Sequence, residues 1–327
     1  MIPFRYERAT DVANAVALLA DSPGARVLAG GTNLVDHLKL GITEPPVIID
    51  ISRLPLDTVD RRGDGTVRVG TNVRNSDLAA HSIIRREHPM LARALLAGAS
   101  PQLRNLATTG GNLLQRTRCV YFQDLSTPCN KRRPGSGCSA LGGYTRYHAI
   151  LGASDTCVAT HPSDMAVAMA ALDASVVLLG PEGQRTVPVR EFHRLPGDQP
   201  NRDTVIGPDE IIIAVDLPPV APGAVGTYRK VRDRASYAFA LVSVAAEVQM
   251  SDRRVTAARI ALGGVAHKPW RAERAEASLL GREATESELA AAADAEFDAA
   301  EPLEGNEFKV SLARRTLIAT LREVVSS

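Results

Sequence analysis

Four cysteines fall within one window of the chain, and they are the residues with the clearest capacity for metal or redox chemistry. No other cysteine occurs among the 327 residues. Four such residues are compatible with two disulfides, a structural zinc site completed in part by His148 or His161, an iron–sulfur cluster held by four thiolates, or unrelated buried thiols. Their spacing contains no C-x-x-C pair and runs Cys119-x9-Cys129-x8-Cys138-x18-Cys157.

This spacing does not decide among the four alternatives. Zinc sites and the common cluster motifs use more closely spaced cysteines, and a large chain without an export signal has little need of disulfides. Unrelated thiols should be scattered through the core. Cationic neighbours favour thiolates and would offset an anionic cluster, although a solvated surface loop would carry the same charges. These neighbours are Arg116, Arg118, Lys131, Arg132 and Arg133.

Two glycine-rich segments of similar form indicate a bound phosphate. The first is Ala29-Gly30-Gly31-Thr32-Asn33-Leu34, and the second is Thr108-Thr109-Gly110-Gly111-Asn112-Leu113. Paired glycines let a ligand approach bare backbone N–H groups, and successive N–H groups form an anion-binding concavity. A pyrophosphate is the natural ligand, and two ordinary tight turns are the alternative.

The better-known nucleotide-binding motifs are missing. No G-x-x-x-x-G-K-[ST] sequence occurs. A formal G-x-G-x-x-A at Gly135, Gly137 and Ala140 lies inside the cysteine window and lacks the strand–helix context of a dinucleotide fold. The sequence therefore gives no indication of a nicotinamide site.

The segments that could do chemistry need regular elements to position them. Apolar runs predict strands at 26–29, 47–51, 175–179 and 211–217. Helical periodicity predicts helices at 12–19, 34–40, 76–97 (interrupted near residue 89) and 165–172. Prolines at 218, 219 and 222 indicate a boundary, after which we expect strands at 226–232, 238–250 and 255–264 and helices at 270–298 and from 306 to the end.

Residues 98–162 stand apart because they are rich in Gly, Pro, Ser, Thr and Arg. A loop of this length is either functional or disordered. The four cysteines favour function.

Composition limits the class of protein. Apolar residues make up 45% and charged residues 23%, as in ordinary soluble domains. The net charge of +1 gives no attraction to nucleic acid or to an anionic membrane. No stretch approaches the roughly 20 apolar residues of a membrane span, and residues 1–10 lack a signal-peptide core, so we expect no signal peptide. The length predicts two or three domains.

Together the motifs resemble those of one flavoprotein family. The two glycine-rich segments, followed by Ser163-Asp164-Met165 before a helix, are similar in type and order to the FAD-binding subunits of the xanthine dehydrogenase family. These are the medium subunits of molybdenum hydroxylases. The segments 209–212 and 228–230 also resemble that family, so the likeness covers essentially the whole chain. The runs 119–124, 128–132, 134–138 and 157–162 resemble the FAD subunit of bacterial, periplasmic-type three-subunit aldehyde oxidoreductases.

The resemblance implies an α+β chain with a vanillyl-alcohol-oxidase (PCMH)-type FAD-binding fold. The FAD-binding domain would span 1–222, as subdomains of about 1–54 and 55–222 with an iron–sulfur loop at 115–162. A C-terminal α/β domain of the CO dehydrogenase flavoprotein type would span 223–327. In that branch of the family the inserted loop binds a 4Fe–4S cluster, whose ligands here would be Cys119, Cys129, Cys138 and Cys157.

The resemblance also implies a set of flavin contacts. The pyrophosphate would contact Arg26, Val27, Leu28, Ala29, Gly30, Gly31, Thr32, Asn33 and Leu34. The remaining phosphate and the ribityl side would contact Thr108, Thr109, Gly111 and Asn112. Asp164 would bind the ribityl hydroxyls, the backbone of Ile212 would contact the ring region, and Lys230 would lie near the isoalloxazine. Tyr237 could cover a ring face.

The implied function is electron transfer, with no general base or nucleophile in this chain. A molybdopterin-binding large subunit would oxidise the aldehyde, and a 2Fe–2S small subunit would pass electrons to the FAD of this chain, which delivers them to an external acceptor. The alternatives are an FAD-dependent reductase or oxidase with a structural zinc loop, and a non-catalytic nucleotide-binding subunit. The expected location is the periplasm, by co-export with a partner that carries the signal, or the cytoplasm.

Overall fold

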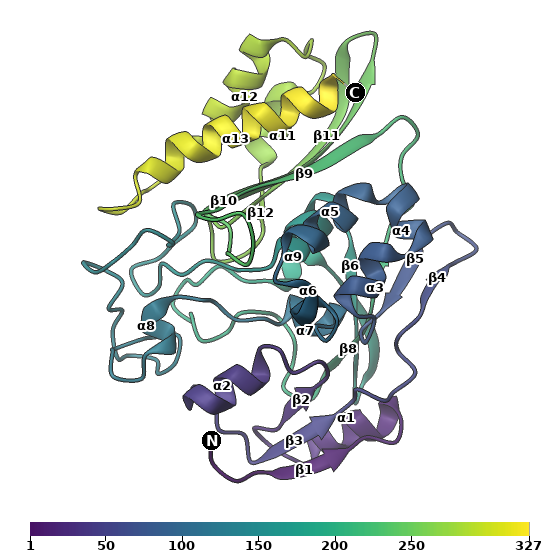
Figure 1. The fold of residues 1–327 in the computed structure, drawn as a ribbon, viewed down its shortest axis with the longest axis vertical. Coiled ribbons are helices and arrows are strands. Elements are labelled where there is room, and N and C mark those ends of the chain that lie inside the picture. Colours follow the sequence, from purple (N-terminus) through teal and green to yellow (C-terminus); the bar gives the residue numbers. More distant parts are fainter. Residues whose placement is uncertain (327) are drawn as a thin grey trace.

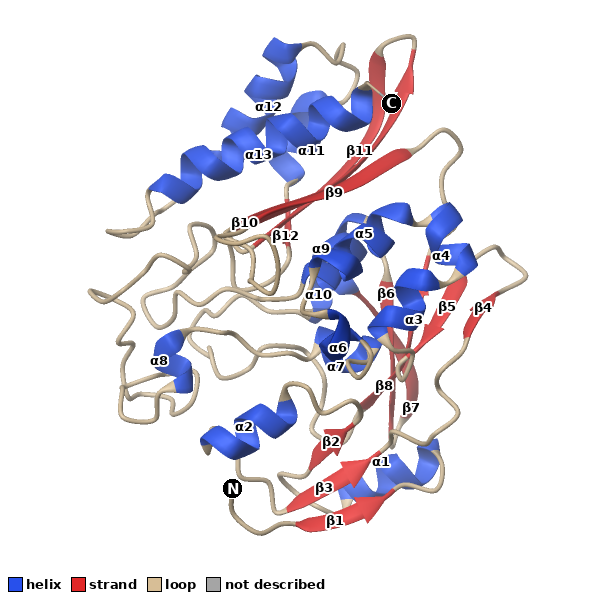
Figure 2. Cartoon of the chain, in the orientation of Figure 1, coloured by secondary structure: helices blue, strands red, loops and turns tan. Residues whose placement is uncertain are grey.

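The computed structural model describes residues 1–326 and folds them around three β-sheets (Figures 1 and 2). In the view of Figure 1, the N-terminal sheet lies at the bottom, the central sheet in the middle and the C-terminal sheet at the top. Each sheet has helices packed beside it. The site described below lies where these three units meet.

The N-terminal unit is a small parallel sheet in the order β1-β3-β2, with one helix packed on it. Its core forms because α1 places Ala15, Val16 and Leu19 on one face, against the fully buried strand β3. Helix α2 ends at Gly41, whose φ of +69° suits glycine. The elements are β1 (Arg5–Arg8), α1 (Val12–Ala20), β2 (Arg26–Leu28), α2 (Leu34–Leu40) and β3 (Val47–Asp50).

The central unit is an antiparallel sheet in the order β4-β5-β8-β6-β7, covered by short helices. The strands are β4 (Val59–Arg61), β5 (Val67–Gly70), β6 (Ser175–Gly180), β7 (Gly183–Pro188) and β8 (Ile211–Leu217). The helices are α3 (Asn75–Ala80), α4 (Ser82–Glu87), α5 (Pro89–Ala97), α6 (Pro101–Arg104), α7 (Thr109–Leu113), α9 (Asp164–Ala171) and α10 (Val189–Phe192).

Helix α9 is the centre of this unit and is buried along its whole length. It contacts α5 and α7 on one side and strands β10 and β11 of the C-terminal sheet on the other. A helix enclosed in this way is apolar all round, which its sequence DMAVAMAA is after the first residue. It therefore joins the central and C-terminal units.

Residues 114–163 form a long excursion whose one helix is α8 (Val120–Gln123). We call residues 115–162 the cysteine loop. In Figure 1 it occupies the left side of the molecule, between α2 below and the start of α13 above. Bridges Cys129↔Cys138 and Ser154↔Cys157 fold it back on itself.

The C-terminal unit is an antiparallel sheet in the order β12-β11-β10-β9, with three helices packed against it. The strands are β9 (Val225–Val231), β10 (Val242–Ser251), β11 (Arg254–Gly263) and β12 (Trp270–Arg271). The helices are α11 (Glu273–Leu279), α12 (Glu286–Phe297) and α13 (Phe308–Val325).

The strands and helices predicted from periodicity are confirmed, with three differences. The helical stretch expected at 76–97 is three helices, because His81 adopts extended backbone and Pro89 starts a new first turn. The stretch expected at 270–298 contains β12 and then breaks at Gly281, whose φ is +76°. Strand β7 was not predicted because it is an edge strand whose exposed residues give no apolar alternation.

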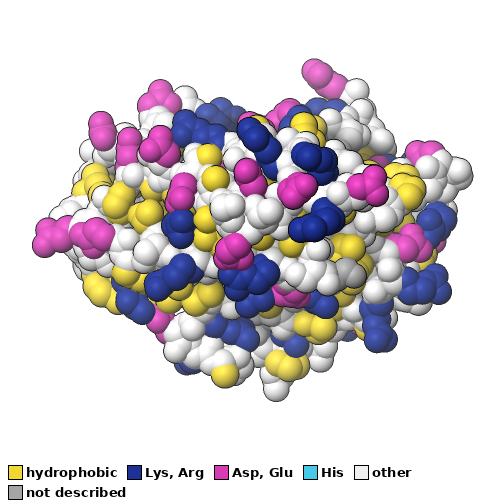
Figure 3. All heavy atoms as spheres, turned by 90° about the horizontal axis from the view of Figure 1, so that it is seen from above, with side chains coloured by type: hydrophobic (Ala, Val, Ile, Leu, Met, Phe, Trp, Pro, Cys, Tyr) yellow, Lys and Arg dark blue, Asp and Glu magenta, His cyan; other side chains and the backbone are white. Residues whose placement is uncertain are grey.

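The surface and helices agree with the composition. Figure 3 views the end of the molecule that carries the C-terminal helices, where cationic and acidic side chains are interspersed. Ion pairs such as Arg314–Asp294 and Arg322–Glu286 lie on these helices. Within residues 1–326, no helix combines the length and the apolar character that a membrane crossing requires.

Candidate functional site

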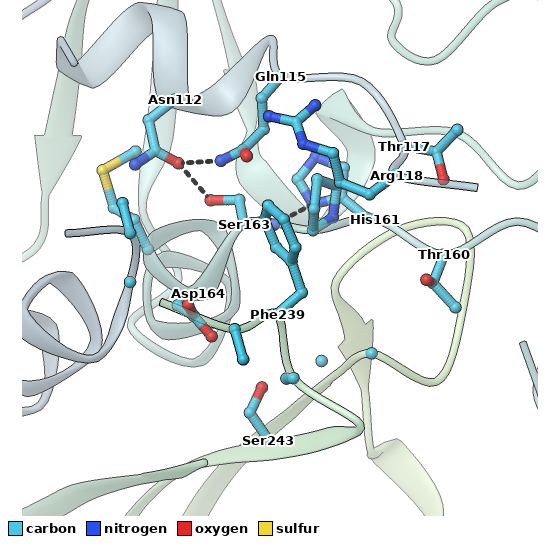
Figure 4. A pocket seen from close by; sticks show the side chains of 18 of the residues that line it. Asn112, Gln115, Thr117, Arg118, Thr160, His161, Ser163, Asp164, Phe239 and Ser243 are labelled. Atoms are coloured by element: carbon cyan, nitrogen blue, oxygen red, sulfur yellow. Dashed lines mark hydrogen bonds between the residues drawn. The ribbon is translucent and has the colours of Figure 1, made fainter. Parts of the chain in front are cut away.

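A cavity of about 610 Å³ lies where the three units and the cysteine loop meet. Its lining comes from residues 32–36, 94–120, 144–148, 160–167, 233–243 and 263–264. Figure 4 shows its polar wall, with Asn112, Gln115, Arg118 and Asp164 around the space. Pockets of this size commonly hold small molecules and cofactors.

The two glycine-rich segments pack against one another beside this cavity. A side chain at Gly30 would collide with the backbone carbonyl of Leu106, just before the second segment, and one at Gly110 would collide with the Thr71 hydroxyl. The second segment opens α7, where the Thr108 hydroxyl accepts a hydrogen bond from Gly111 N at 3.4 Å. Glycine is therefore required at both places by close backbone approach.

Asn112 organises the polar wall of the cavity. Its Nδ2 donates to Asn75 Oδ1 at 2.6 Å. Its Oδ1 accepts from Gln115 Nε2 at 2.7 Å and from Ser163 Oγ at 2.6 Å, as the dashed lines in Figure 4 show. These bonds hold residues from α3, α7 and the start of α9 in one fixed arrangement.

Asp164 belongs to a buried charged group at the same wall. Its Oδ2 accepts from Lys230 Nζ at 2.8 Å, and its Oδ1 accepts from the Tyr228 hydroxyl at 2.5 Å. The Asp164 and Lys230 side chains are 7% and 4% exposed. Burial and the adjacent Asp164 carboxylate hold the pKa of Tyr228 well above its usual value. Ser163, not Asp164, caps α9, because its Oγ accepts from Ala166 N at 2.9 Å.

Only some of the predicted flavin contacts line the cavity. Those that do are Thr32, Asn33, Gly111, Asn112 and Asp164. Those outside its lining are Arg26, Val27, Leu28, Ala29, Gly30, Gly31, Leu34, Thr108, Thr109, Ile212 and Lys230. Ile212 is buried in β8 behind Gly110, and Lys230 contacts Asp164 and the Ala97 carbonyl. Tyr237 lines the cavity in a left-handed conformation, with φ of +51°.

Sequence reasoning missed two cations of this wall. Arg118 donates to the Arg116 carbonyl at 2.9 Å and lies over the Phe239 ring, 5.2 Å from its centroid. Burial lowers the pKa of Arg118, and it makes no ion pair with any residue among 1–326. Arg104 also lines the cavity and donates to the Gly98 carbonyl at 2.6 Å. The sequence had suggested only that Arg118 offsets charge near the cysteines.

The four cysteines line a second, much smaller cavity of about 10 Å³. None of them is in a disulfide. Burial raises the pKa of Cys119 and of Cys157 to about 11. Within residues 1–326, no three His, Cys, Asp or Glu side chains are close enough together to hold a single metal ion. The sequence placed all four cysteines in one window, and the fold brings them to one cavity.

A buried cation anchors the cysteine loop to the rest of the molecule. Lys131, with a side chain 1% exposed, forms an ion pair with Asp203 and donates to the Pro200 carbonyl at 2.8 Å and to His267 Nε2 at 2.6 Å. Asp203 also accepts from Arg116 Nε at 2.7 Å. Although burial raises the pKa of Asp203, these two cations hold it well below its ordinary value. Arg116 N in turn donates to Asn33 Oδ1 at 2.9 Å, which links the loop to the first glycine-rich segment.

Comparison with known proteins gives this geometry a family. The model of an FAD binding domain in molybdopterin dehydrogenase matches residues 2–220. The chain belongs to that family of flavoproteins. The CO dehydrogenase flavoprotein C-terminal domain matches residues 226–324. The interval between the two matches contains Pro222, where the domain boundary was predicted.

Individual relatives of this FAD-binding subunit match along almost its full length. It is 53% identical to the aldehyde oxidoreductase FAD-binding subunit of Escherichia coli strain K12, over 99% of this chain and 98% of that protein. It is 30% identical to the carbon monoxide dehydrogenase medium chain of Hydrogenophaga pseudoflava, over 93% and 90% of the two chains. The structure of carbon monoxide dehydrogenase from the same organism superposes with a TM-score of 0.78 at 30% identity, covering 100% of this chain and 99% of that one.

These matches confirm the predicted fold class. The mixed helix and sheet architecture is that of an FAD-binding domain followed by a CO dehydrogenase flavoprotein C-terminal domain. The chain is a subunit of an FAD-dependent oxidoreductase of the molybdenum hydroxylase family.

Proposed function

We propose that this chain is the FAD and 4Fe–4S electron-transfer subunit of a molybdenum-dependent aldehyde oxidoreductase. The observation that carries the proposal is the convergence of Cys119, Cys129, Cys138 and Cys157 on one cavity beside a flavin-sized one. The 53% identity to an aldehyde oxidoreductase FAD-binding subunit supports the reaction class.

The large cavity fits an extended flavin nucleotide. Thr32, Asn33 and Gly111 offer donors at one wall, and Arg118 supplies a buried cation with no ion-pair partner among residues 1–326. A diphosphate would supply the missing negative charge. Asp164 would accept hydrogen bonds from the ribityl hydroxyls, and Lys230 would hold its carboxylate in place. The other predicted contacts would act through backbone groups or from behind the cavity wall.

The small cavity fits a four-iron cluster better than a single zinc ion. The four sulfurs line one space, yet no three ligand side chains among residues 1–326 reach a common ion position. A 4Fe–4S cluster takes its four thiolates on four different irons, which spaces the sulfurs more widely than one tetrahedral ion does. The cationic side chains of Lys131 and Arg132 lie in the same loop and would offset its negative charge.

The chain's own groups would bind and position these cofactors rather than transform a substrate. The bound flavin and cluster would supply the redox chemistry, and the protein would set their position and potential. Substrate oxidation would occur in a molybdopterin-binding large subunit. A 2Fe–2S small subunit would connect it to this chain, which passes electrons to an external acceptor.

Replacement of each cysteine by alanine tests the cluster assignment. Each of Cys119→Ala, Cys129→Ala, Cys138→Ala and Cys157→Ala should abolish the electron paramagnetic resonance signal of a reduced 4Fe–4S cluster and lower the iron content. Ser136→Ala, in the same loop, is the control and should keep the signal. If the Cys157 variant kept the wild-type signal, that residue would not be a ligand. If the wild-type chain bound zinc without iron, the chain would be a flavoprotein with a structural zinc loop.

A further inference from the structure

The flavin-sized cavity and the cysteine cavity share a wall, and Cys119 is the cysteine that stands in it. Cys119 lines both cavities, whereas Cys129, Cys138 and Cys157 line the small one alone. Cys119 precedes α8, whose first residue, Val120, also lines the large cavity. Of the four thiol groups, that of Cys119 is therefore the one that faces the larger space.

His148 contacts the sulfur of Cys119. Its Nε2 lies 3.1 Å from Cys119 Sγ, well within hydrogen-bond range for sulfur. Among residues 1–326 this is the one side-chain hydrogen bond made to a cysteine sulfur. His148 also lines the large cavity, so the His148–Cys119 pair forms part of the shared wall.

The position of His148 is fixed from several sides. Its ring stacks on that of Tyr121, with centroids 6.4 Å apart and planes at 25°. Its carbonyl accepts from Lys309 Nζ at 2.7 Å and from Asn306 Nδ2 at 3.3 Å, both in the C-terminal unit. The Lys309 side chain is fully buried, and it also donates to the Gly264 carbonyl. The C-terminal unit thus holds the imidazole against the cysteine loop.

We propose that His148 is a positioning residue that donates a hydrogen bond from Nε2 to the Cys119 thiolate and so sets the reduction potential of the cluster at the ligand nearest the flavin. This inference rests on the proposed function, since it requires the cluster. A thiolate only accepts, so Nε2 carries the proton in this arrangement. Nδ1 is buried without a partner among residues 1–326, as the deprotonated nitrogen of that tautomer can be.

The direction of the effect follows from charge. Reduction adds negative charge to a cluster and its thiolates, and a hydrogen bond to sulfur stabilises that charge. The donor therefore raises the reduction potential. Its loss should lower the potential without removing any of the four ligands.

The test is a potentiometric titration of the cluster, followed by electron paramagnetic resonance, in the full chain. His148→Leu should shift the midpoint potential to more negative values. His148→Gln, which retains an N–H donor of similar reach, should lie between His148→Leu and wild type. Tyr121→Phe is the matched control: it keeps the ring on His148, removes only the hydroxyl that accepts from Tyr144 N, and should leave the potential unchanged.

Labelling the histidines with ¹⁵N gives a second readout that does not depend on whether a variant assembles its cluster. The reduced wild-type cluster should show a weak ¹⁵N hyperfine coupling in pulsed paramagnetic resonance, because His148 is hydrogen bonded to a ligand sulfur. Wild type without this coupling, or a His148→Leu potential equal to that of wild type, would overturn the inference while leaving the cluster assignment intact. A wild-type chain with no cluster signal would instead overturn the proposed function.

Discussion

At the scale of single residues, the site depends on buried charges that are satisfied by one another. Lys230 and Asp164 form the clearest case, since both side chains are almost fully buried and Tyr228 completes the group. Removing one partner of a buried pair leaves the other charge uncompensated, whereas removing both does not.

The pair leads to a prediction about stability. Lys230→Met should lower the free energy of unfolding by about 3–5 kcal/mol, and the double variant Asp164→Leu/Lys230→Met should recover much of that loss. Urea unfolding followed by circular dichroism measures both values. Arg314→Met, which breaks an exposed pair with Asp294, is the control and should change stability little. A single variant as stable as wild type would contradict the described pairing.

Residue types in the sequence predicted part of this site. The window of four cysteines led to the cysteine cavity, because cysteines are scarce enough for their clustering to be informative. The hydrogen bonds of Asn112 with Asn75, Gln115 and Ser163 could not be predicted. Isolated polar residues separated by up to 51 positions carry no periodic signal, and only the fold brings them together.

At the scale of elements, the two glycine-rich segments act as one structure. Gly30 packs on the Leu106 carbonyl, so the end of β2 is held directly against the approach to α7. The likeness of the two segments was visible in the sequence, but their contact was not. It depends on sheets β1-β3-β2 and β4-β5-β8-β6-β7 being placed side by side.

This contact predicts the effect of one added methyl group. Gly30→Ala should push the two segments apart, lower stability by about 1–3 kcal/mol and weaken FAD binding about tenfold, which is ~1.4 kcal/mol. Flavin fluorescence quenching measures the affinity. Gly63→Ala is the matched control, because a Cβ there meets nothing within 4 Å, and its affinity should equal that of wild type. Equal affinities for Gly30→Ala and wild type would show that the close packing does not shape the site.

At the scale of the whole molecule, buried histidines connect stability to pH. Burial lowers the pKa of five of them to about 4: His37, His88, His148, His193 and His267. Their pKa in the unfolded chain is about 6.5. Between these values the unfolded state binds protons that the folded state does not, so stability rises with pH in this window and is lost as the pH falls from 6.5 toward 4.

The prediction is a steep loss of thermal stability on acidification. Each histidine should contribute up to about 1.4 kcal/mol per pH unit within the window. His88 isolates the effect, because both of its ring nitrogens are buried without a partner among residues 1–326. The midpoint of thermal unfolding between pH 4.5 and 7.5 should fall less steeply in His88→Leu than in wild type. Identical slopes would show that His88 does not remain neutral in the folded state.

The architecture of the whole molecule was the part most accessible from the sequence. Apolar periodicity located most strands and helices, and the resemblance of ordered motifs supplied their arrangement. The roles of Arg118 and Lys131 could not be predicted in the same way, since the charge of an arginine or lysine in a loop does not reveal whether it is buried. Arg118 faces the large cavity and Lys131 is enclosed by Asp203 and His267 because the cysteine loop folds between the units.

The most direct test of this account is the content of iron, acid-labile sulfide, zinc and flavin in the full chain, produced without partner subunits and purified anaerobically. The account predicts one FAD with about four irons and four sulfides per chain, the content of one 4Fe–4S cluster, and no stoichiometric zinc. One flavin with zinc, or with no metal at all, would contradict it.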